Sequence, residues 1–520
     1  MIYWPALDGP PISDDFRFLL NPWVTNPAPE HLLALLDPRS EATRSLANYA
    51  PVRPLVNTLQ WWLHPQLSIA YHVLNLFLHC VVTVLLSVFL RSVGVSPAAA
   101  VLSGTFFLVQ PANVEAIAWM SQVWSPLALA FSLLALLALA RRPLTATLWL
   151  ALALLTKPLA VFSVPAAAAL AWSRTDLRLR TERELQTPPR WGWIAAWAML
   201  VLLFTIAQLM AYGDTGPRQR LDEDPAVAFR SMATYALRYL LMASSSWGVS
   251  AFHEPPLSLS WSDPWLLAAA VVLLLLGARL VVTLRRRSPE AAGWIWVLAA
   301  FAPVSQIFPF LYPMSDRYLY FMLPGLLLAA CFAGGDLLAR LPSERARGLA
   351  RQGLVGATLV VCILFGLRSA ERARIWRSED AVMADAARHY PGGVSDLFLR
   401  ARRAASEGDV ATAETLLRRA SARGWDFWNV LLKQPAFEPI RGERRFKALL
   451  ADLAAAQIEK LERQPRLSQA ELRNLADAHA VRGETAAALA ALDTAIARGG
   501  PFDESLRERR NELARTASPR

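Results

Sequence analysis

The sequence has few charged residues and few cysteines. Charged residues make up 18% of its 520 residues, whereas ordinary soluble chains have about 25%. Together with a hydrophobic fraction of 54%, this excludes an intrinsically disordered chain and a simple coiled coil, and it argues against an all-soluble protein. The three cysteines all fall inside apolar segments and share no metal-ligand spacing, so neither a disulfide framework nor a zinc site is predicted.

Acidic residues are outnumbered by basic ones, 42 to 53, and the net charge is +11. In a membrane protein positive residues gather in cytoplasmic loops, so this charge requires no nucleic-acid partner. Arginines do cluster in every second loop between the apolar segments. The clusters are Arg91, Arg141–Arg142, residues 174–190, residues 285–287 and residues 340–351. We expect these five loops to be cytoplasmic and the remaining loops and both termini to lie outside.

Apolar segments dominate residues 68–368, whereas residues 1–67 are polar, rich in proline and predicted to be an outer loop. We expect ten helices, over residues 69–90, 97–109, 123–140, 144–156, 159–172, 192–212, 264–284, 292–311, 319–339 and 353–367, with a long outer loop at 213–262. Several are shorter than the roughly 20 residues of a perpendicular span, which is tolerated where a helix lines a protein cavity. The halves show no internal symmetry, which argues against a secondary transporter.

Residues 369–520 change to helical sequence rich in Ala, Arg and Glu. Two stretches share one register of small and large apolar residues: Leu397, Ala401, Ala404, Ala413, Leu417 and Ala420, then Leu472, Ala476, His479, Ala488, Leu492 and Ala495. This register is typical of the 34-residue tetratricopeptide helical hairpin, with turns at Gly408 and Gly483. An irregular unit over 425–464 would complete the stack, since a solenoid needs about three units. An ordinary helical bundle is the alternative.

Asp14 and Asp15 form a pair of adjacent carboxylates in the first outer loop. Neighbouring carboxylates against a membrane can include one with a raised pKa, which suits it to accept a proton from a hydroxyl group. The alternative is an N-cap for a short helix over residues 16–20, because Asp is a preferred cap.

Polar residues also lie on the first apolar helix. His72, Asn75 and His79 are spaced i, i+3 and i+7, so they share one face, which must look into the bundle because polar groups are costly toward lipid. Hydrogen bonding between helices is the simpler explanation. Arg53, just before this helix, could clamp a phosphate.

Three further outer positions carry charges. Glu115 stands among apolar residues, which makes it a functional candidate unless it merely pairs with a structural arginine. Lys157 separates two half-length helices and either binds phosphate or extends toward water. Asp316, Arg317 and Tyr318 open the segment 319–339, where Asp316 suits a helix N-terminus and Arg317 is either a phosphate contact or an interfacial anchor.

These candidates come from five places in the chain, and the arginine pattern puts all five on one side of the membrane. Carboxylates and cations at a membrane surface suit a lipid-phosphate donor and a hydroxyl acceptor. A divalent metal could sit between the carboxylate pair and a phosphate, although no ligand cluster demands one.

The motifs, taken in order, resemble a known family. They are Asp14-Asp15, Arg53-Pro54-Leu55, Tyr71-His72 with Asn75 and His79, Gln110-Pro111 through Glu115 to Trp119, Lys157-Pro158, and Asp316-Arg317-Tyr318-Leu-Tyr320 with Pro324-Gly325. Followed by tetratricopeptide-like units, they resemble the transmembrane and tetratricopeptide repeat O-mannosyltransferases and their bacterial relatives. These are polytopic glycosyltransferases of the GT-C type.

The resemblance implies a polyprenyl- or dolichyl-phosphate sugar donor and an inverting transfer to a hydroxyl, often of Ser or Thr. It implies that Asp14 or Asp15 is the catalytic acid, that Glu115 is the second carboxylate and that Arg317 contacts phosphate. The chain departs from the family at Gln110, where relatives have His, and at Gln122 to Ser125, where relatives have basic and acidic residues. Relatives also have a helix before the acidic loop, so we expect one more helix upstream of Met1.

The sequence therefore predicts an all-α protein of the cytoplasmic (inner) membrane, with a GT-C-type core over 68–368 and an extracytoplasmic, periplasmic repeat domain over 369–520. It would transfer a sugar from a polyprenyl-phosphate donor to a hydroxyl, such as Ser or Thr of an envelope protein, and the repeat domain would recruit the acceptor or a partner. The alternative is a catalytically silent scaffold with a partner-binding repeat array. Gln110 and Gln122 favour the scaffold, and the intact Asp14-Asp15 pair with Glu115 disfavours it.

Overall fold

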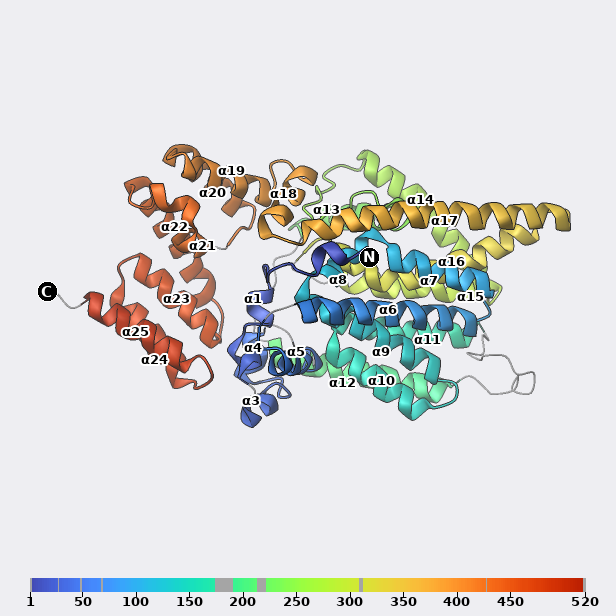
Figure 1. Cartoon of the computed structure of the whole chain (residues 1–520), viewed down its shortest axis with the longest axis horizontal. Helices are drawn as coiled ribbons and strands as arrows, with labels where there is room; N and C mark the ends of the chain where they lie inside the picture. Colours follow the sequence, from blue (N-terminus) through green and yellow to red (C-terminus); the bar gives the residue numbers. More distant parts are fainter. Residues whose placement is uncertain are drawn as a thin grey trace. The chain divides into compact units, whose positions relative to one another are not determined.

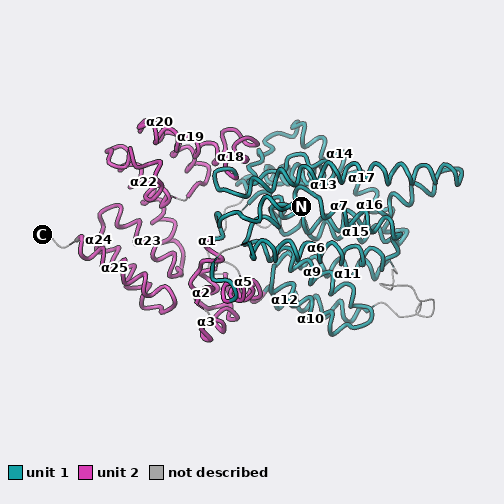
Figure 2. Tube along the Cα trace, in the orientation of Figure 1, with its two compact units in different colours: residues 1–15, 63–205, 218–381 teal, residues 16–62, 206–217, 382–520 magenta. Residues whose placement is uncertain are grey.

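The computed structural model describes residues 2–26, 28–46, 49–66, 69–173, 190–212, 221–307, 312–426 and 428–517. Within these residues every regular element is a helix (Figure 1). The chain divides into two compact units (Figure 2). Unit 1 comprises residues 1–15, 63–205 and 218–381, and unit 2 comprises residues 16–62, 206–217 and 382–520. The predicted boundary at residue 67 therefore does not coincide with the division between the units.

All ten predicted apolar segments of the membrane core are helical. They form α6 (Ile69–Ser92), α7 (Pro97–Val109), α9 (Trp124–Ala138), α10 (Pro143–Thr156), α11 (Ser163–Trp172), α12 (Trp191–Tyr212), α14 (Pro264–Arg285), α15 (Pro289–Phe301), α16 (Asp316–Ala339) and α17 (Glu344–Ile375). Among the described residues six helices are long and apolar enough to cross a membrane, or seven if the bent pair at 97–118 is one span. This agrees with a multi-pass membrane protein.

One long helix of unit 1 was not predicted. α13 (Pro225–Ser245) lies in the segment 213–262 that was predicted to be a loop, and that prediction is wrong for these residues. Its apolar pattern is interrupted by arginines, so it contains no continuous apolar run. The buried Arg230 is accommodated because its guanidinium donates to the carbonyls of Ser258 and Leu259 at 3.0 and 3.2 Å.

Two helices differ most from their predicted bounds. α17 begins at Glu344 and ends at Ile375, well beyond 353–367, because the Ser343 hydroxyl caps its N-terminus and polar turns extend the helix past its apolar part. α15 ends at Phe301 and is followed by a 3₁₀ turn, η6 (Ala302–Val304), whereas residues 308–311 lie outside the described part of the chain.

Arginines of the predicted cytoplasmic loops gather at one end of unit 1. The contacts are Arg190 with the carbonyl of Ala140 at 3.2 Å, Arg287 over the ring of Trp172 at 4.8 Å, and Arg286 and Arg340 with Asp336 at 3.8 and 3.3 Å. Four of the five arginine loops therefore lie together, although Arg174, Arg178, Arg180 and Arg183 fall outside the described residues. The side of the membrane on which this end lies stays a prediction.

α15 and α16 pack closely through two glycines. A Cβ atom on Gly293 would lie 2.6 Å from the backbone nitrogen of Ala329, and one on Gly325 would lie 2.8 Å from the carbonyl oxygen of Gly293. The indole of Trp296 also donates to the carbonyl of Phe321 at 2.8 Å. This contact fixes α16, whose first turn carries Asp316 and Arg317.

Unit 2 contains the two helical hairpins predicted from the sequence. They are α19 (Val394–Ser406) with α20 (Val410–Ala422), and α23 (Gln469–Val481) with α24 (Thr485–Ala497). Their turns contain Gly408 and Gly483 at φ of 79° and 77°, values that glycine adopts without strain. Between and around the hairpins lie α18 (Glu379–His389), α21 (Val430–Lys433), η7 (Pro435–Ile440), α22 (Arg444–Glu462) and α25 (Asp503–Ala517).

Most of the first-loop segment belongs to unit 2. Its short helices are α1 (Asp15–Phe18), α2 (Pro22–Thr25), α3 (Pro29–Ala34), α4 (Glu41–Ser45) and α5 (Val52–Leu63). Glu41 accepts a hydrogen bond from the backbone of Gln469 and pairs with Arg498 at 3.4 Å. Trp23 packs in one apolar cluster with Phe502. Most of the predicted loop is therefore a helical segment docked within unit 2, whereas residues 1–15 and the end of the segment from Leu63 belong to unit 1.

Candidate functional site

A short broken segment of unit 1 holds most of the candidate residues. It consists of η2 (Pro111–Asn113), α8 (Val114–Ala118) and η3 (Met120–Val123), and it bends by 52° away from α7. Pro111 follows the end of α7 and cannot continue a helical hydrogen-bond ladder. Asn75 of α6 holds the bend, because its Nδ2 donates to the carbonyls of Ile117, Trp119 and Met120 at 3.3, 3.0 and 3.3 Å. The interhelical explanation of Asn75 is thus confirmed.

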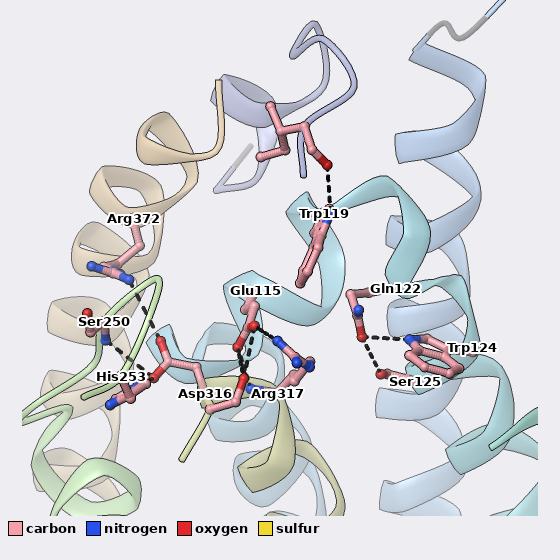
Figure 3. A network of polar contacts seen from close by, with 12 residues as sticks. Glu115, Trp119, Gln122, Trp124, Ser125, Ser250, His253, Asp316, Arg317 and Arg372 are labelled. Carbon is pink, nitrogen blue, oxygen red and sulfur yellow. Dashed lines mark hydrogen bonds and ion pairs between the residues drawn. The ribbon is translucent and has the colours of Figure 1, made fainter. Parts of the chain in front are cut away.

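Glu115 of α8 is paired with Arg317 of α16 (Figure 3). One carboxylate oxygen accepts from the guanidinium and the other from the backbone N–H of Arg317 at 2.7 Å. The hydroxyl of Ser315 lies 2.9 and 3.0 Å from the two oxygens. Both charged side chains are buried. Pairing with an arginine, one of the two explanations of Glu115, is therefore what the structure shows.

Asp316 forms a second buried ionic cluster beside this pair (Figure 3). Its carboxylate lies 2.7 Å from His253 Nε2 and 3.7 Å from Arg372, and it accepts from the backbone N–H of Ser250 at 3.3 Å. His253 and Ser250 lie in the loop that follows α13, and Arg372 lies in the last turns of α17. None of these three was identified from the sequence, because no motif or periodicity marks them.

Lys157 points into the protein. Its ammonium group donates to the hydroxyl of Ser125 at 2.7 Å and lies 4.7 Å from the ring centre of Trp124. Gln122 completes this group, because its side-chain oxygen accepts from the Trp124 indole at 2.6 Å and from Ser125 at 3.3 Å. Lys157 is only 3% exposed, so its cation does not extend to the surface.

The acidic pair divides into one buried and one partly exposed carboxylate. Asp15 is fully buried, and it accepts from the backbone N–H groups of Ile12 at 3.0 Å and Ser121 at 2.8 Å. Burial raises the pKa of Asp15 from 3.8 to about 7, while the two backbone donors oppose this rise. Asp14 is partly exposed, and its carboxylate accepts no hydrogen bond from the residues that the structure describes. Asp15 is the first residue of α1, so it is not the N-cap of that helix.

Trp119 connects the acidic turn with the Glu115–Arg317 pair. Its indole N–H donates to the carbonyl of Ile12 at 3.3 Å (Figure 3), and its ring stacks on Trp376 with 5.4 Å between centres. The guanidinium carbon of Arg317 lies 5.3 Å from the same indole ring. Asp15, Glu115 and Arg317 are thus joined through one tryptophan and the backbone around it.

The other supporting candidates have structural partners. His72 Nε2 lies 3.2 Å from the carbonyl of Gly9, and His79 contacts Tyr320 at 3.0 Å and Tyr3 at 3.3 Å. Both histidines are buried, as their shared helix face predicted. Tyr318 is buried, with the Arg317 guanidinium 5.3 Å from its ring centre.

Arg53 has its described contacts within unit 2. It lies in unit 2, where its buried guanidinium sits 3.9 Å above the ring of Phe18 and donates to the carbonyl of Leu46 at 3.4 Å. Its assignment to a phosphate stays a prediction.

Known proteins do not identify the chain. No protein-family model matches it, and no curated protein and no solved structure is similar to it. The chemistry must therefore be argued from the geometry.

The described part of unit 1 contains carboxylates and cations but no cluster of metal ligands. Among the described residues, no three His, Cys, Asp or Glu side chains are grouped so that they could hold a metal ion. The segment 111–124 is instead surrounded by two carboxylates and two cations. The carboxylates are the partly exposed Asp14 and the buried Asp15, and the cations are the buried Lys157 and Arg317. Such an arrangement can remove a proton from a hydroxyl and offset negative charge on a phosphate.

Proposed function

We propose that this protein is a GT-C-type membrane glycosyltransferase that transfers a sugar from a polyprenyl-phosphate donor to a hydroxyl group with inversion. The acceptor is a Ser or Thr of an envelope protein, recruited by the tetratricopeptide-like hairpins of unit 2. One observation carries this proposal: the segment 111–124 joins the acidic turn at Asp14-Asp15 to the buried cations Arg317 and Lys157. The site faces the extracytoplasmic side of the inner membrane.

Asp14 is the catalytic base in this mechanism, because it is the more exposed carboxylate of the pair. It accepts the proton of the acceptor hydroxyl while the oxygen attacks the anomeric carbon. The bond between that carbon and the phosphate oxygen breaks, and the lipid phosphate leaves with the electron pair. Asp15 is a positioning residue, since its carboxylate accepts backbone hydrogen bonds from Ile12 and Ser121 and thereby fixes the turn.

Arg317 and Lys157 offset the charge that develops on the departing phosphate. Cationic donors in a water-poor site stabilise such charge more strongly than they would in water. Glu115 holds the Arg317 guanidinium and its backbone in place, and Trp119 supports the same group from its ring face.

Removing the base tests the proposal. We expect Asp14→Asn to lower sugar transfer by roughly 100-fold or more while leaving folding and donor binding nearly unchanged. Glycans on envelope proteins are compared between a deletion strain and the same strain complemented with wild-type or variant protein. Asp8→Asn is the matched control, because Asp8 lies in the same turn region but is exposed and paired with Arg377 at 2.7 Å. Unchanged envelope glycans in Asp14→Asn, Asp15→Asn and the double variant would refute the assignment of this protein as a glycosyltransferase.

A silent scaffold is the second candidate, and the complete pairing of Glu115 favours it. Gln110 also has a structural partner, since it donates to the carbonyl of Ala243 at 2.8 Å. Glu115→Gln separates the two functions. The enzyme requires a loss of sugar transfer at temperatures where the variant is still folded, whereas the scaffold requires only a lower melting temperature.

A further inference from the structure

The loop between α13 and α14 exposes large aromatic and apolar side chains. In residues 246–263, Leu259 is 73% exposed, Trp261 is 63% exposed and Trp247 is 47% exposed. Phe229 of α13, next to Arg230, is 61% exposed. Single exposed apolar residues are common, but two tryptophans and a leucine exposed in one loop mark a binding surface.

Two arginines hold the tryptophans of this loop in place. The guanidinium carbon of Arg230 lies 4.9 Å from the ring centre of Trp261, and that of Arg238 lies 4.3 Å from the ring centre of Trp265. Trp247 stacks on Trp265 with 5.1 Å between ring centres. The exposed rings are therefore fixed on a cationic support.

The same surface continues into the lipid-facing side of α14. Trp265 is the second residue of this helix, which is 22 residues long with a mean hydropathy of 2.5 in its most apolar window. Leu267, Val271 and Leu274 follow on one face at i, i+4 and i+7, and all three are more than half exposed. If α14 crosses the bilayer, Trp265 and the rings stacked around it lie at the boundary between the lipid headgroups and the hydrocarbon core.

We propose that residues 246–263 form an interfacial anchor, with Trp247, Leu259 and Trp261 inserted into the lipid headgroup region of one leaflet. Tryptophan prefers this layer because its ring is apolar and its N–H can remain hydrated. The occupant of the surface is the bilayer itself, because the patch is continuous with the lipid-exposed face of α14.

This anchor also ties the membrane surface to the candidate site. Ser250 and His253 belong to the same loop and bind Asp316, the neighbour of Arg317 in sequence. The loop therefore places the Asp316 cluster at the depth of the headgroups. The inference stands independently of the proposed sugar transfer, since it follows from exposure and stacking alone.

The depth of a nitroxide label in lipid tests the anchor. In a variant without Cys80, Cys331 and Cys362, a label on Ser260→Cys lies between Leu259 and Trp261 and leaves every tryptophan intact. The protein is reconstituted in vesicles of phosphatidylcholine and phosphatidylglycerol, and collision rates with oxygen and with a water-soluble nickel complex are measured. Leu275→Cys, exposed on α14, is the hydrocarbon reference, and Ser406→Cys, exposed in unit 2, is the water reference.

We expect nickel accessibility at residue 260 to be several-fold lower than at residue 406 and higher than at residue 275. The double change Trp247→Ala and Trp261→Ala should raise it toward the water reference, while Trp261→Tyr should not. A label at residue 260 as accessible as residue 406 would overturn the anchor and leave a protein partner as the occupant. Because the first measurement keeps all tryptophans, it decides the matter even if the double variant fails to fold.

Discussion

The two ends of unit 1 both hold carboxylates paired with arginines, but they differ in how far the charges are removed from solvent. At one end Asp336 pairs with Arg286 and Arg340, whose side chains are both 60% exposed. At the other end the side chains of Glu115 and Arg317 are 1% and 11% exposed. Asp316 and Asp336 mark the two ends on a single helix, roughly 30 Å apart at 1.5 Å per residue.

This difference indicates what each end does. Exposed pairs contribute little to stability, and arginine-rich loops at one end of a membrane protein are explained by orientation alone. Buried charges carry a desolvation cost that well-packed apolar residues would avoid. The Asp336 end also holds a buried carboxylate, Glu290, but its partner Arg279 is 28% exposed. Among the described residues of these two ends, both members of an ion pair are largely buried only at the Glu115–Arg317 end, and this end calls for a functional explanation.

Removing Arg317 should have the largest effect on stability. Arg317→Ala leaves Glu115 buried without its cation, which typically costs about 3–5 kcal/mol. At the exposed end, Arg340→Ala should cost less than about 1 kcal/mol. Denaturant or thermal unfolding in detergent measures both. Equal losses of stability in the two variants would show that the two ends of unit 1 do not differ in the energetic effect of burial.

Separating α15 from α16 should lower the stability of the protein by an intermediate amount, because this contact supports both ends of unit 1. Gly293→Ala places a methyl group against the backbone of α16, and such overpacking costs about 1–3 kcal/mol. Gly277→Ala on α14 is the matched control, because a Cβ there meets no atom within 4 Å. A melting temperature as high in Gly293→Ala as in Gly277→Ala would contradict the close contact.

The Asp15 carboxyl should give an effect on stability that depends on pH. Its pKa of about 7 in the folded protein lies above the ordinary 3.8, so the folded state binds the proton more tightly. Its contribution to stability is then fully present below about pH 4 and is lost as pH rises through about 7. Asp15→Asn should therefore gain stability relative to wild type between about pH 5 and about pH 8. Melting curves of the two proteins check this, with Asp8→Asn as control. A difference that does not change with pH would contradict the raised pKa.

The sequence predicted the membrane core well because long apolar runs are a strong local signal. All ten segments are helical, and the charge pattern correctly grouped four arginine loops at one end. Glu115 was recognised because a carboxylate among apolar residues is costly without a partner, and Arg317 is that partner.

Other features depend on contacts that no local pattern encodes. α13 was missed because its arginines interrupt the apolar pattern, and the carbonyls that accept hydrogen bonds from the buried Arg230 come from the loop that follows the helix. His253 was missed because it reaches Asp316 from irregular sequence. The docking of Glu41 onto α23 joins residues more than 400 positions apart, a pairing that only the folded chain reveals.

The proposed mechanism depends on a first-loop carboxylate that removes the acceptor proton. Its most direct test is sugar transfer in nanodiscs from a purified polyprenyl-phosphate sugar to a Ser/Thr peptide, by wild-type protein and Asp14→Asn side by side. We predict transfer by the wild type and a fall of roughly 100-fold or more in the variant, with donor binding retained. Equal transfer by the two proteins, or none by the folded wild type with any polyprenyl-phosphate sugar, would contradict the account.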